Sequence, residues 1–205
     1  AAVLTSATLK SLGNFNTLQR ETGVPSSAHF LSVAGAFNYA EAATVRVPPG
    51  AVEGNSIEEH SKYIVDNLES MVEDKAGTLV LFSSKRQMEQ VFDELPNHLA
   101  KIILIQGQYS NREMVRLHKE RIDQGKSSVL LGLASFAEGV DLPGDYCKHV
   151  VIAKLPFAVP DDPLHEALSE WIEGKGGNSF FDISLPIASL RLIQACGRLL
   201  RTESD

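Results

Sequence analysis

Two arginines and a glutamine near the end of the chain have the types and spacing of a phosphate-binding surface. Gln194, Arg198 and Arg201 follow one another at intervals of four and three residues, so on a helix they share a sector of about 60°, opposite an apolar side. A guanidinium can bind two phosphate oxygens at once. This stripe therefore predicts recognition of a polyphosphate. For an isolated pair of arginines, a solvated charged face is the alternative interpretation.

The composition is that of a globular domain, and it limits how nucleic acid could be bound. The chain has 205 residues, 43% of them hydrophobic, and a formal net charge of −7. This negative charge excludes a general electrostatic attraction to nucleic acid, which local basic and amide groups must bind instead. The two cysteines, Cys147 and Cys196, match no metal-ligand spacing and indicate a reduced, cytoplasmic setting. The sequence contains no signal peptide and no membrane-spanning apolar run.

From residue 56 onward, apolar runs alternate with helical patterns. We expect strands at 78–82, 102–105, 129–133 and 149–152, and helices over 56–73, from Ser84 to Leu95, and from Ser110 to Gly125. Gln87 and Glu113 each lie three residues after the serine that starts a helix, which predicts two capping boxes. The strands are continuously apolar, as in a parallel sheet covered on both faces. The pattern therefore predicts a doubly wound, mostly parallel α/β sheet with helices on both faces.

The first fifty residues are less regular. We expect a short strand over 1–8, a helix over 11–22 that stops at Gly23, and β-like pieces at 29–33 and 43–47. The cluster Pro48-Pro49-Gly50 is the best boundary in the sequence. The chain lacks an initiator Met and closes soon after Arg201, which indicates a piece of a longer protein.

The loops that follow the predicted strands carry small polar residues. Ligands of such sheets bind beyond the carboxyl ends of the strands. Ser83 and Ser84 follow one strand, Gln106 the next, and Ser135 the third. Hydroxyl and amide groups can donate to phosphates without any net positive charge. Singly each is a weak signal, because a serine before a helix is first of all an N-cap, but their recurrence predicts a phosphate-binding edge.

Other polar residues allow two interpretations each. Asp141 could hold a ribose hydroxyl or a metal-bound water, or it could form an Asx turn before Pro143. Glu138 could join the same site or be solvated. His118 lies on the apolar side of its helix, which predicts a hydrogen-bonded core or interface histidine.

Aromatic residues flank the loop 174–177. Trp171 precedes this glycine-rich loop, and Phe180 and Phe181 follow it. These rings could stack on nucleic-acid bases. Covering the edge of a core is the interpretation that we favour.

The order of these segments resembles that of the numbered motifs of superfamily 2 helicases. Residues 3–9 (VLTSATL) resemble motif III, 79–84 motif IV, 135–144 motif V and 194–201 motif VI. The form of motif V, SFAEGVD, and the following LPF and PDDP are similar to the iron–sulfur XPD/DinG branch, in particular its bacterial DinG/YoaA-like members. The resemblance covers nearly the whole chain. It implies a RecA-like fold, with 53–205 as most of the second motor domain and 1–52 as the end of the first plus the crossover.

The resemblance also implies an activity and a role for each polar residue. It implies an ATP-dependent DNA helicase that moves along single-stranded DNA with 5′-to-3′ polarity. Arg198 and Arg201 would stabilise charge on the γ-phosphate of ATP, with Gln194 positioning them or the attacking water. The other implied sets are Glu138, Gly139 and Asp141 for sensing nucleotide, Ser83, Ser84, Gln106 and Ser135 for DNA phosphates, and Thr5, Ser6 and Thr8 for coupling the two sites.

The implied cofactors depend on residues that this sequence does not contain. It has no G-x-x-x-x-G-K-[ST] phosphate loop, no D-E-x-H motif and no four-cysteine cluster. ATP and Mg²⁺ would therefore be shared with a first motor domain, a 4Fe–4S cluster would have its ligands elsewhere, and the chain alone would hydrolyse no ATP. The implied partners are single-stranded, forked or damaged DNA and replication or repair proteins. The alternative is a non-catalytic RecA-like module that docks such a protein.

Overall fold

The computed structural model describes residues 2–35, 38–52, 56–157 and 162–199, with the backbone only of residues 39, 40 and 138. The chain divides into two compact units. We call residues 36–154 and 195–205 the sheet unit, and residues 1–35 and 155–194 the helical unit. The assignment of residues 1–52 and 53–205 to two motor domains stays a prediction.

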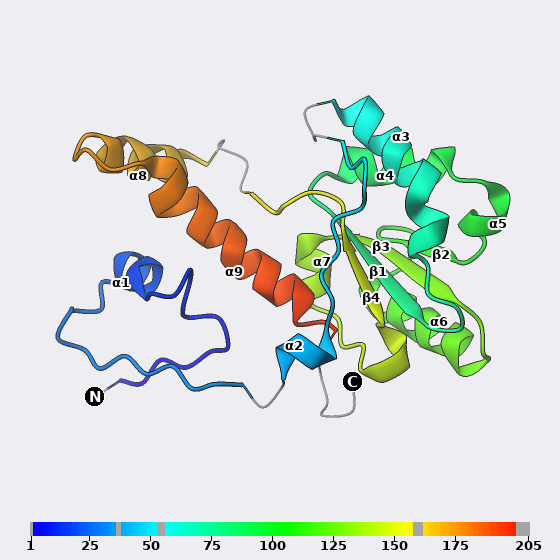
Figure 1. Cartoon of the computed structure of the whole chain (residues 1–205), viewed down its shortest axis with the longest axis horizontal. Coiled ribbons are helices and arrows are strands. Elements are labelled where there is room, and N and C mark those ends of the chain that lie inside the picture. Colours follow the sequence, from blue (N-terminus) through cyan, green and yellow to red (C-terminus); the bar gives the residue numbers. More distant parts are fainter. Residues whose placement is uncertain (1, 36–37, 53–55, 158–161, 200–205) are drawn as a thin grey trace. The chain divides into compact units, whose positions relative to one another are not determined.

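The sheet unit is built on four parallel strands (Figure 1). They are β1 (Gly77–Phe82), β2 (Ile103–Ile105), β3 (Ser128–Leu133) and β4 (His149–Ile152). Their order across the sheet is β2-β3-β1-β4, with Leu79 paired with Leu130 on one side and with Val150 on the other. All four predicted strands are confirmed to within one residue at each end, and so is the parallel arrangement.

Each strand points alternate side chains into two separate apolar clusters. In β1, Val80 and Phe82 join one cluster, whereas Leu79 and Leu81 join the other. The first cluster is covered by α3 (Ile57–Asn67), η1 (Leu68–Met71), α4 (Lys85–Glu94) and α5 (Asn97–Ala100). The second is covered by α6 (Asn111–Asp123) and α7 (Ala134–Glu138). Both faces of the sheet are buried, which explains why the strands are mostly apolar and lack a polar side; the polar residues Thr78, Ser128 and His149 lie at their first or second positions.

The two predicted capping boxes are half formed. Ser84 and Ser110 cap α4 and α6, since each hydroxyl accepts a hydrogen bond from the backbone N–H three residues later. The return bond to the serine is replaced in both helices. Gln87 instead donates its side-chain amide to His60, at 2.9 Å from Nδ1. The prediction was wrong on this point because Gln87 is buried and its amide is engaged by His60 of α3.

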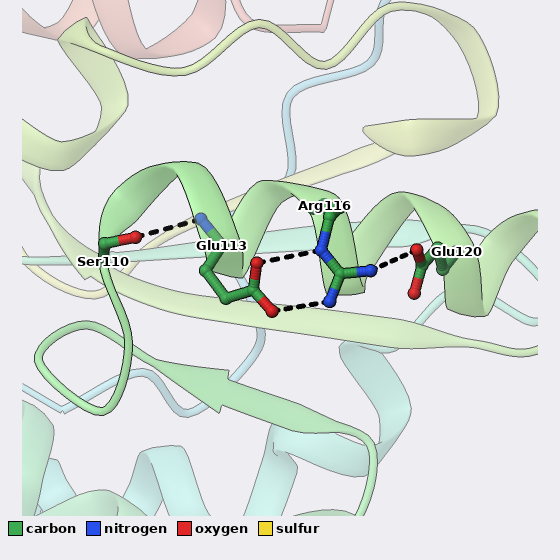
Figure 2. A network of polar contacts seen from close by, with 4 residues as sticks. All are labelled: Ser110, Glu113, Arg116 and Glu120. Carbon is green, nitrogen blue, oxygen red and sulfur yellow. Dashed lines mark hydrogen bonds and ion pairs between the residues drawn. The ribbon is translucent and has the colours of Figure 1, made fainter.

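The carboxylate of Glu113 is drawn along the surface of α6 (Figure 2). Arg116 donates to Glu113 through Nε at 2.8 Å, and it also binds Glu120 one turn further along. The hydrogen bond from Arg116 lowers the pKa of Glu113. This row of exposed i,i+3 and i,i+4 pairs supports α6 modestly and keeps Glu113 from closing the capping box.

His118 is a core residue that ties α6 to the sheet, as the sequence predicted. Its Nε2 lies 2.8 Å from the carbonyl oxygen of Tyr146, and its Nδ1 lies 2.9 Å from the hydroxyl of Ser128. The carbonyl can only accept, so Nε2 carries the proton and Nδ1 accepts from Ser128. Burial lowers the pKa of His118 to about 4. Gly77 makes room here, because a Cβ at that position would meet the Tyr146 carbonyl oxygen at 1.9 Å.

The helical unit contains helices and irregular chain. Its elements are α1 (Asn16–Thr22), α8 (Pro163–Glu173), the π-helical turn η3 (Phe180–Ser184) and all but the last two residues of α9 (Leu185–Cys196). Helix α1 ends at Gly23 in a left-handed conformation, as predicted. It begins five residues later than predicted, because Ser11 and Asn14 bridge a tight turn in which Leu12 and Gly13 have positive φ.

The predicted strands of the first fifty residues are wrong. Residues 2–6 and 29–33 have no regular structure, and Val3 is 89% exposed. In the sheet unit, residues 43–47 are also irregular and follow the short helix α2 (Tyr39–Ala42). A strand is stable only when a neighbour pairs with its backbone, and no described strand pairs with these segments. No helix in the described part of the chain is long and apolar enough to cross a membrane.

Candidate functional site

The loop that follows β3 is fixed to the core by its apolar residues. Phe136, Val140 and Leu142 are buried in the apolar cluster below α7. Gly132 in β3 allows this packing, since a Cβ there would approach the Phe136 ring to 2.6 Å. The predicted residues Ser135, Gly139 and Asp141 alternate with these anchors and are exposed. The loop therefore presents its polar groups outward from a rigid base; the side chain of Glu138 lies outside the described residues.

The helix that carries the predicted arginine stripe ends earlier than expected. Helix α9 stops at Cys196, and a turn follows in which Arg198 N–H donates to the Ala195 carbonyl at 3.1 Å. Gly197 explains the stop, because glycine favours leaving a helix. The common helical stripe was therefore a wrong prediction for Arg198. Arg201 lies outside the described residues.

Arg198 nevertheless lies at the edge of the sheet where ligands were predicted to bind. Its Nη1 donates to the backbone carbonyl of Val140 at 3.0 Å, and its side chain is half-buried. Ala195 and Leu199, on either side, pack into the cluster below α7. The guanidinium is thereby held beside the loop that contains Gly139 and Asp141. No sequence signal marked Val140 as a partner, because its contribution is a backbone oxygen.

The loops after β1 and β2 place the other predicted residues of this edge. Ser83 is exposed, whereas Ser84 is half-buried and caps α4. Gln106 is engaged in the fold: its side-chain oxygen accepts the Leu133 N–H at 2.8 Å. The main chain turns away at Gly107, where φ is +104°, so the side chain of Gln106 continues the pairing between β2 and β3. Gln106 therefore holds the start of the β3 loop.

The predicted coupling residues meet Gln194 within the helical unit. Gln194 Nε2 donates to the hydroxyl of Thr8 at 3.2 Å. The backbone N–H of Thr8 donates to the hydroxyl of Ser6 at 3.3 Å. Thr5 is exposed and takes no part in these bonds. The segment that resembles motif III is thus in contact with the first residue of the segment that resembles motif VI.

The described residues contain no group of three or more His, Cys, Asp and Glu side chains that could hold a metal ion. Both cysteines are free thiols, Cys147 buried and Cys196 exposed. Beside the carboxylate of Asp141, this edge presents serine hydroxyls, loop N–H groups and Arg198, which offer hydrogen-bond donation and positive charge. Such groups suit phosphate oxygens.

Comparison with known proteins agrees with this geometry. Residues 68–205 match the family model described as "Helicase C-terminal domain". The chain belongs to this family. The matched residues include the four strands, α9 and the turn after it that contains Arg198.

Relatives of this helicase C-terminal domain match the whole chain. The protein named "ATP-dependent DNA helicase DinG" of Photobacterium profundum is 41% identical over 210 residues, which cover 100% of this chain and 30% of that protein. The protein of the same name from Escherichia coli (strain K12) is 37% identical over 207 residues, 98% of this chain and 29% of that protein. The chain thus spans about 30% of the length of these relatives.

A solved structure titled "XPD_Helicase" shares the fold. It has a TM-score of 0.50 and 20% identity, and the match covers 76% of this chain and 27% of that one. The predicted RecA-like α/β fold is confirmed. The predicted resemblance to the XPD/DinG branch is likewise confirmed by the family and by the DinG relatives.

Proposed function

We propose that this helicase C-terminal domain is part of an ATP-dependent DNA helicase that moves 5′-to-3′ along single-stranded DNA in the cytoplasm. It would act on forked or damaged DNA during repair or replication, together with proteins of those processes. The family and the relatives' printed name, ATP-dependent DNA helicase, support the proposal. In this proposal, residues 53–205 form the second motor domain, and residues 1–52 belong to the first domain and the crossover.

The observation that carries the proposal is the position of Arg198. The Val140 carbonyl holds its guanidinium at the carboxyl edge of a parallel sheet, where such folds bind ligands. A γ-phosphate offers a full negative charge in place of the dipole of a carbonyl. Arg198 would therefore leave Val140 for the phosphate when ATP binds and stabilise the charge that develops during hydrolysis. Arg201 would act beside it.

The neighbouring loops would sense nucleotide and bind DNA. Glu138, Gly139 and Asp141 share the loop of Val140, so a move of Arg198 would change their surroundings. DNA phosphates would accept hydrogen bonds from the exposed hydroxyls of Ser83 and Ser135, with help from Ser84. Gln106 would contribute mainly by holding the β3 loop in place, given its bond to Leu133.

Coupling between ATP and DNA would pass through Thr8. Its hydroxyl accepts from Gln194 and its N–H donates to Ser6, so a shift of Gln194 toward the nucleotide would be felt by the segment containing Thr5, Ser6 and Thr8. Gln194 would also position the arginines or the attacking water.

Of the cofactors of the proposed helicase, ATP fits residues of this chain and a 4Fe–4S cluster does not. The phosphates of ATP fit the guanidinium of Arg198, whereas Mg²⁺ takes oxygen ligands, which the first motor domain would supply. A 4Fe–4S cluster does not fit, because it takes four thiolates and the chain has two cysteines, of which Cys147 is buried. The non-catalytic docking module is not favoured, since the relatives that match the whole chain are named ATP-dependent helicases.

The test is ATP hydrolysis by the complete helicase that contains this chain, with single-stranded DNA present. Arg198→Ala should lower the rate at least about 10³-fold, as for arginine fingers generally, and Arg198→Lys should restore little because lysine lacks the fork. Arg46→Ala, an exposed arginine in an irregular segment, is the matched control and should hydrolyse normally. Unchanged hydrolysis by Arg198→Ala would refute the proposal.

A further inference from the structure

A surface hollow of about 320 Å³ lies within the helical unit, apart from the residues assigned above. One wall is α1 with the turn before it, and the other is formed by the end of α8, the loop 174–177 and η3. The walls carry two cations, Arg20 and Lys175, and two large aromatic rings, Trp171 and Phe181. None of these four residues has a role in the helicase function proposed above.

The rings of this hollow are exposed, contrary to the expectation that they cover a core edge. Trp171 is 54% exposed and Phe181 62%. Phe181 meets Phe180 edge-on at 5.3 Å between ring centroids, and Phe180 stacks on Phe157 at 5.6 Å. Phe181 is therefore supported by neighbouring rings, and both Trp171 and Phe181 are accessible to solvent. Exposed, supported aromatic rings are typical of surfaces that receive another planar group.

Both cations are available to an anion. The ammonium of Lys175 rests 3.7 Å from the Trp171 ring centroid, an exposed contact that is readily exchanged. Arg20 donates from Nη1 to the Asp182 carbonyl at 2.7 Å, while its Nε and Nη2 are covered and find no acceptor among the described residues. Covered donors without acceptors are costly, so Arg20 would gain by turning toward a phosphate in the hollow.

The nearby carboxylates are already engaged. Asp182 Oδ2 accepts the Asn178 N–H at 2.9 Å, and Glu173 accepts the hydroxyl of Ser179 at 2.5 Å. These bonds draw both carboxylates toward donors of the loop. The surface of α8 is still acidic, with exposed Glu170 beside Trp171, so stacking must supply more of the affinity than charge.

We propose that this hollow binds one nucleotide of a DNA single strand, with the base stacked on Trp171 and the phosphate held by Lys175 and Arg20. The inference rests on the proposed function, which supplies the strand, and it adds a contact outside the edge of the sheet. A single strand is required because a base must leave its duplex stack to lie on a protein ring.

Trp171 is the only tryptophan of the chain, so its fluorescence reports on this hollow alone. The experiment titrates the 205-residue chain with a dye-labelled thymidine oligonucleotide, and records dye anisotropy for binding and tryptophan emission for stacking. We expect both signals to change with the same dissociation constant. Separate titrations with inorganic phosphate, with dTMP and with a blunt duplex should leave the emission much less affected at equal concentration.

Two variants with matched controls separate stacking from charge. Trp171→Ala should weaken oligonucleotide binding about tenfold, whereas Leu164→Ala, a 75% exposed position on the same helix, should not. Lys175→Gln should reduce the slope of log affinity against log salt by about 0.7, the value for one phosphate contact with a single strand. Lys62→Gln, an exposed lysine on α3, should keep the full slope.

The outcomes distinguish this inference from the proposed function. Binding by anisotropy without a change in emission overturns the inference and leaves the helicase proposal to the Arg198 test. Failure of the oligonucleotide to bind overturns the inference as well. Equal affinity for dTMP and for the oligonucleotide would overturn the assignment to a strand in favour of a free-nucleotide pocket.

Discussion

Similar apolar sequences are buried strands in one unit of the chain and exposed irregular segments in the other. In the sheet unit, the run Leu79–Phe82 is a strand whose side chains are almost fully buried. In the helical unit, residues 29–33 contain Leu31 and Val33, which are 82% and 80% exposed and belong to no strand. The difference lies in the neighbours: β1 has β3 and β4 beside it, and residues 29–33 pair with no described strand.

This difference shows that an apolar run specifies a strand only together with its partners. Pairing satisfies the backbone groups, and the covering helices remove the side chains from water. It also explains why the rigid site lies in the sheet unit. Buried Phe136 and Val140 anchor the β3 loop to the core. The irregular segment 29–33 of the helical unit has no such buried apolar residues.

The largest expected effect comes from a comparison in which one leucine of each unit is replaced by alanine. Leu130→Ala, in β3 and fully buried, should lower the free energy of unfolding by about 3–5 kcal/mol, because it leaves a cavity in the core. Leu31→Ala should change it by less than about 0.5 kcal/mol. Urea denaturation followed by circular dichroism measures both. Similar losses for the two variants would contradict the contrast between the units.

A second test uses the buried histidine of the sheet unit. The pKa of His118 is about 4 in the fold, against the ordinary value of 6.5. The unfolded chain therefore takes up the proton first, and the free energy of unfolding falls as the pH drops from 6.5 toward 4, by about 2 kcal/mol at pH 5.

Urea denaturation at about pH 7.5 and about pH 5 checks this expectation. His118→Gln should lack about 2 kcal/mol of the pH dependence of the unsubstituted chain. His60, whose pKa burial also lowers, is present in both proteins and cancels in the comparison. If the two chains lose stability equally between these pH values, His118 does not titrate as the structure indicates.

The smallest expected effect concerns Gln106 at the edge of the sheet. It helps to distinguish a residue that positions the β3 loop from a residue that contacts DNA. Gln106→Leu removes the acceptor of the Leu133 N–H and should cost about 1 kcal/mol of stability. Gln106→Glu keeps an acceptor oxygen and should restore most of it. Urea denaturation measures this difference.

DNA affinity decides between the two roles of Gln106. If its side chain only holds the β3 loop, Gln106→Glu should bind an oligonucleotide at least as well as Gln106→Leu. If its amide instead donates to a phosphate, the added negative charge makes Gln106→Glu the weaker binder. Fluorescence anisotropy with a labelled thymidine oligonucleotide separates these results.

Much of the sheet unit could be predicted from the sequence because its signals are local. Four apolar runs, the capping serines Ser84 and Ser110, and the helical spacing of apolar residues each depend on a few neighbouring positions. The side-chain partners of Gln87 and Glu113 could not be predicted. Gln87 reaches His60 on another helix and Glu113 reaches Arg116 on its own, and competition among such partners depends on the packed structure.

The candidate site was predicted in its residues more than in its geometry. The strand-end positions of Ser83, Gln106 and Ser135 follow from the strands themselves. The helical stripe of arginines failed at Gly197, and the contact of Arg198 with Val140 joins residues 58 positions apart through a backbone oxygen. No side-chain pattern marks such an acceptor.

The sequence by itself determined the positions of the apolar runs, the helices α3, α4 and α6, and the family, because apolar periodicity and ordered motifs are properties of short segments. Only the tertiary structure decided which apolar runs became strands, where Arg198 points and which rings stay open to solvent. Each of these depends on groups far apart in the chain competing for the same hydrogen bonds and the same buried space.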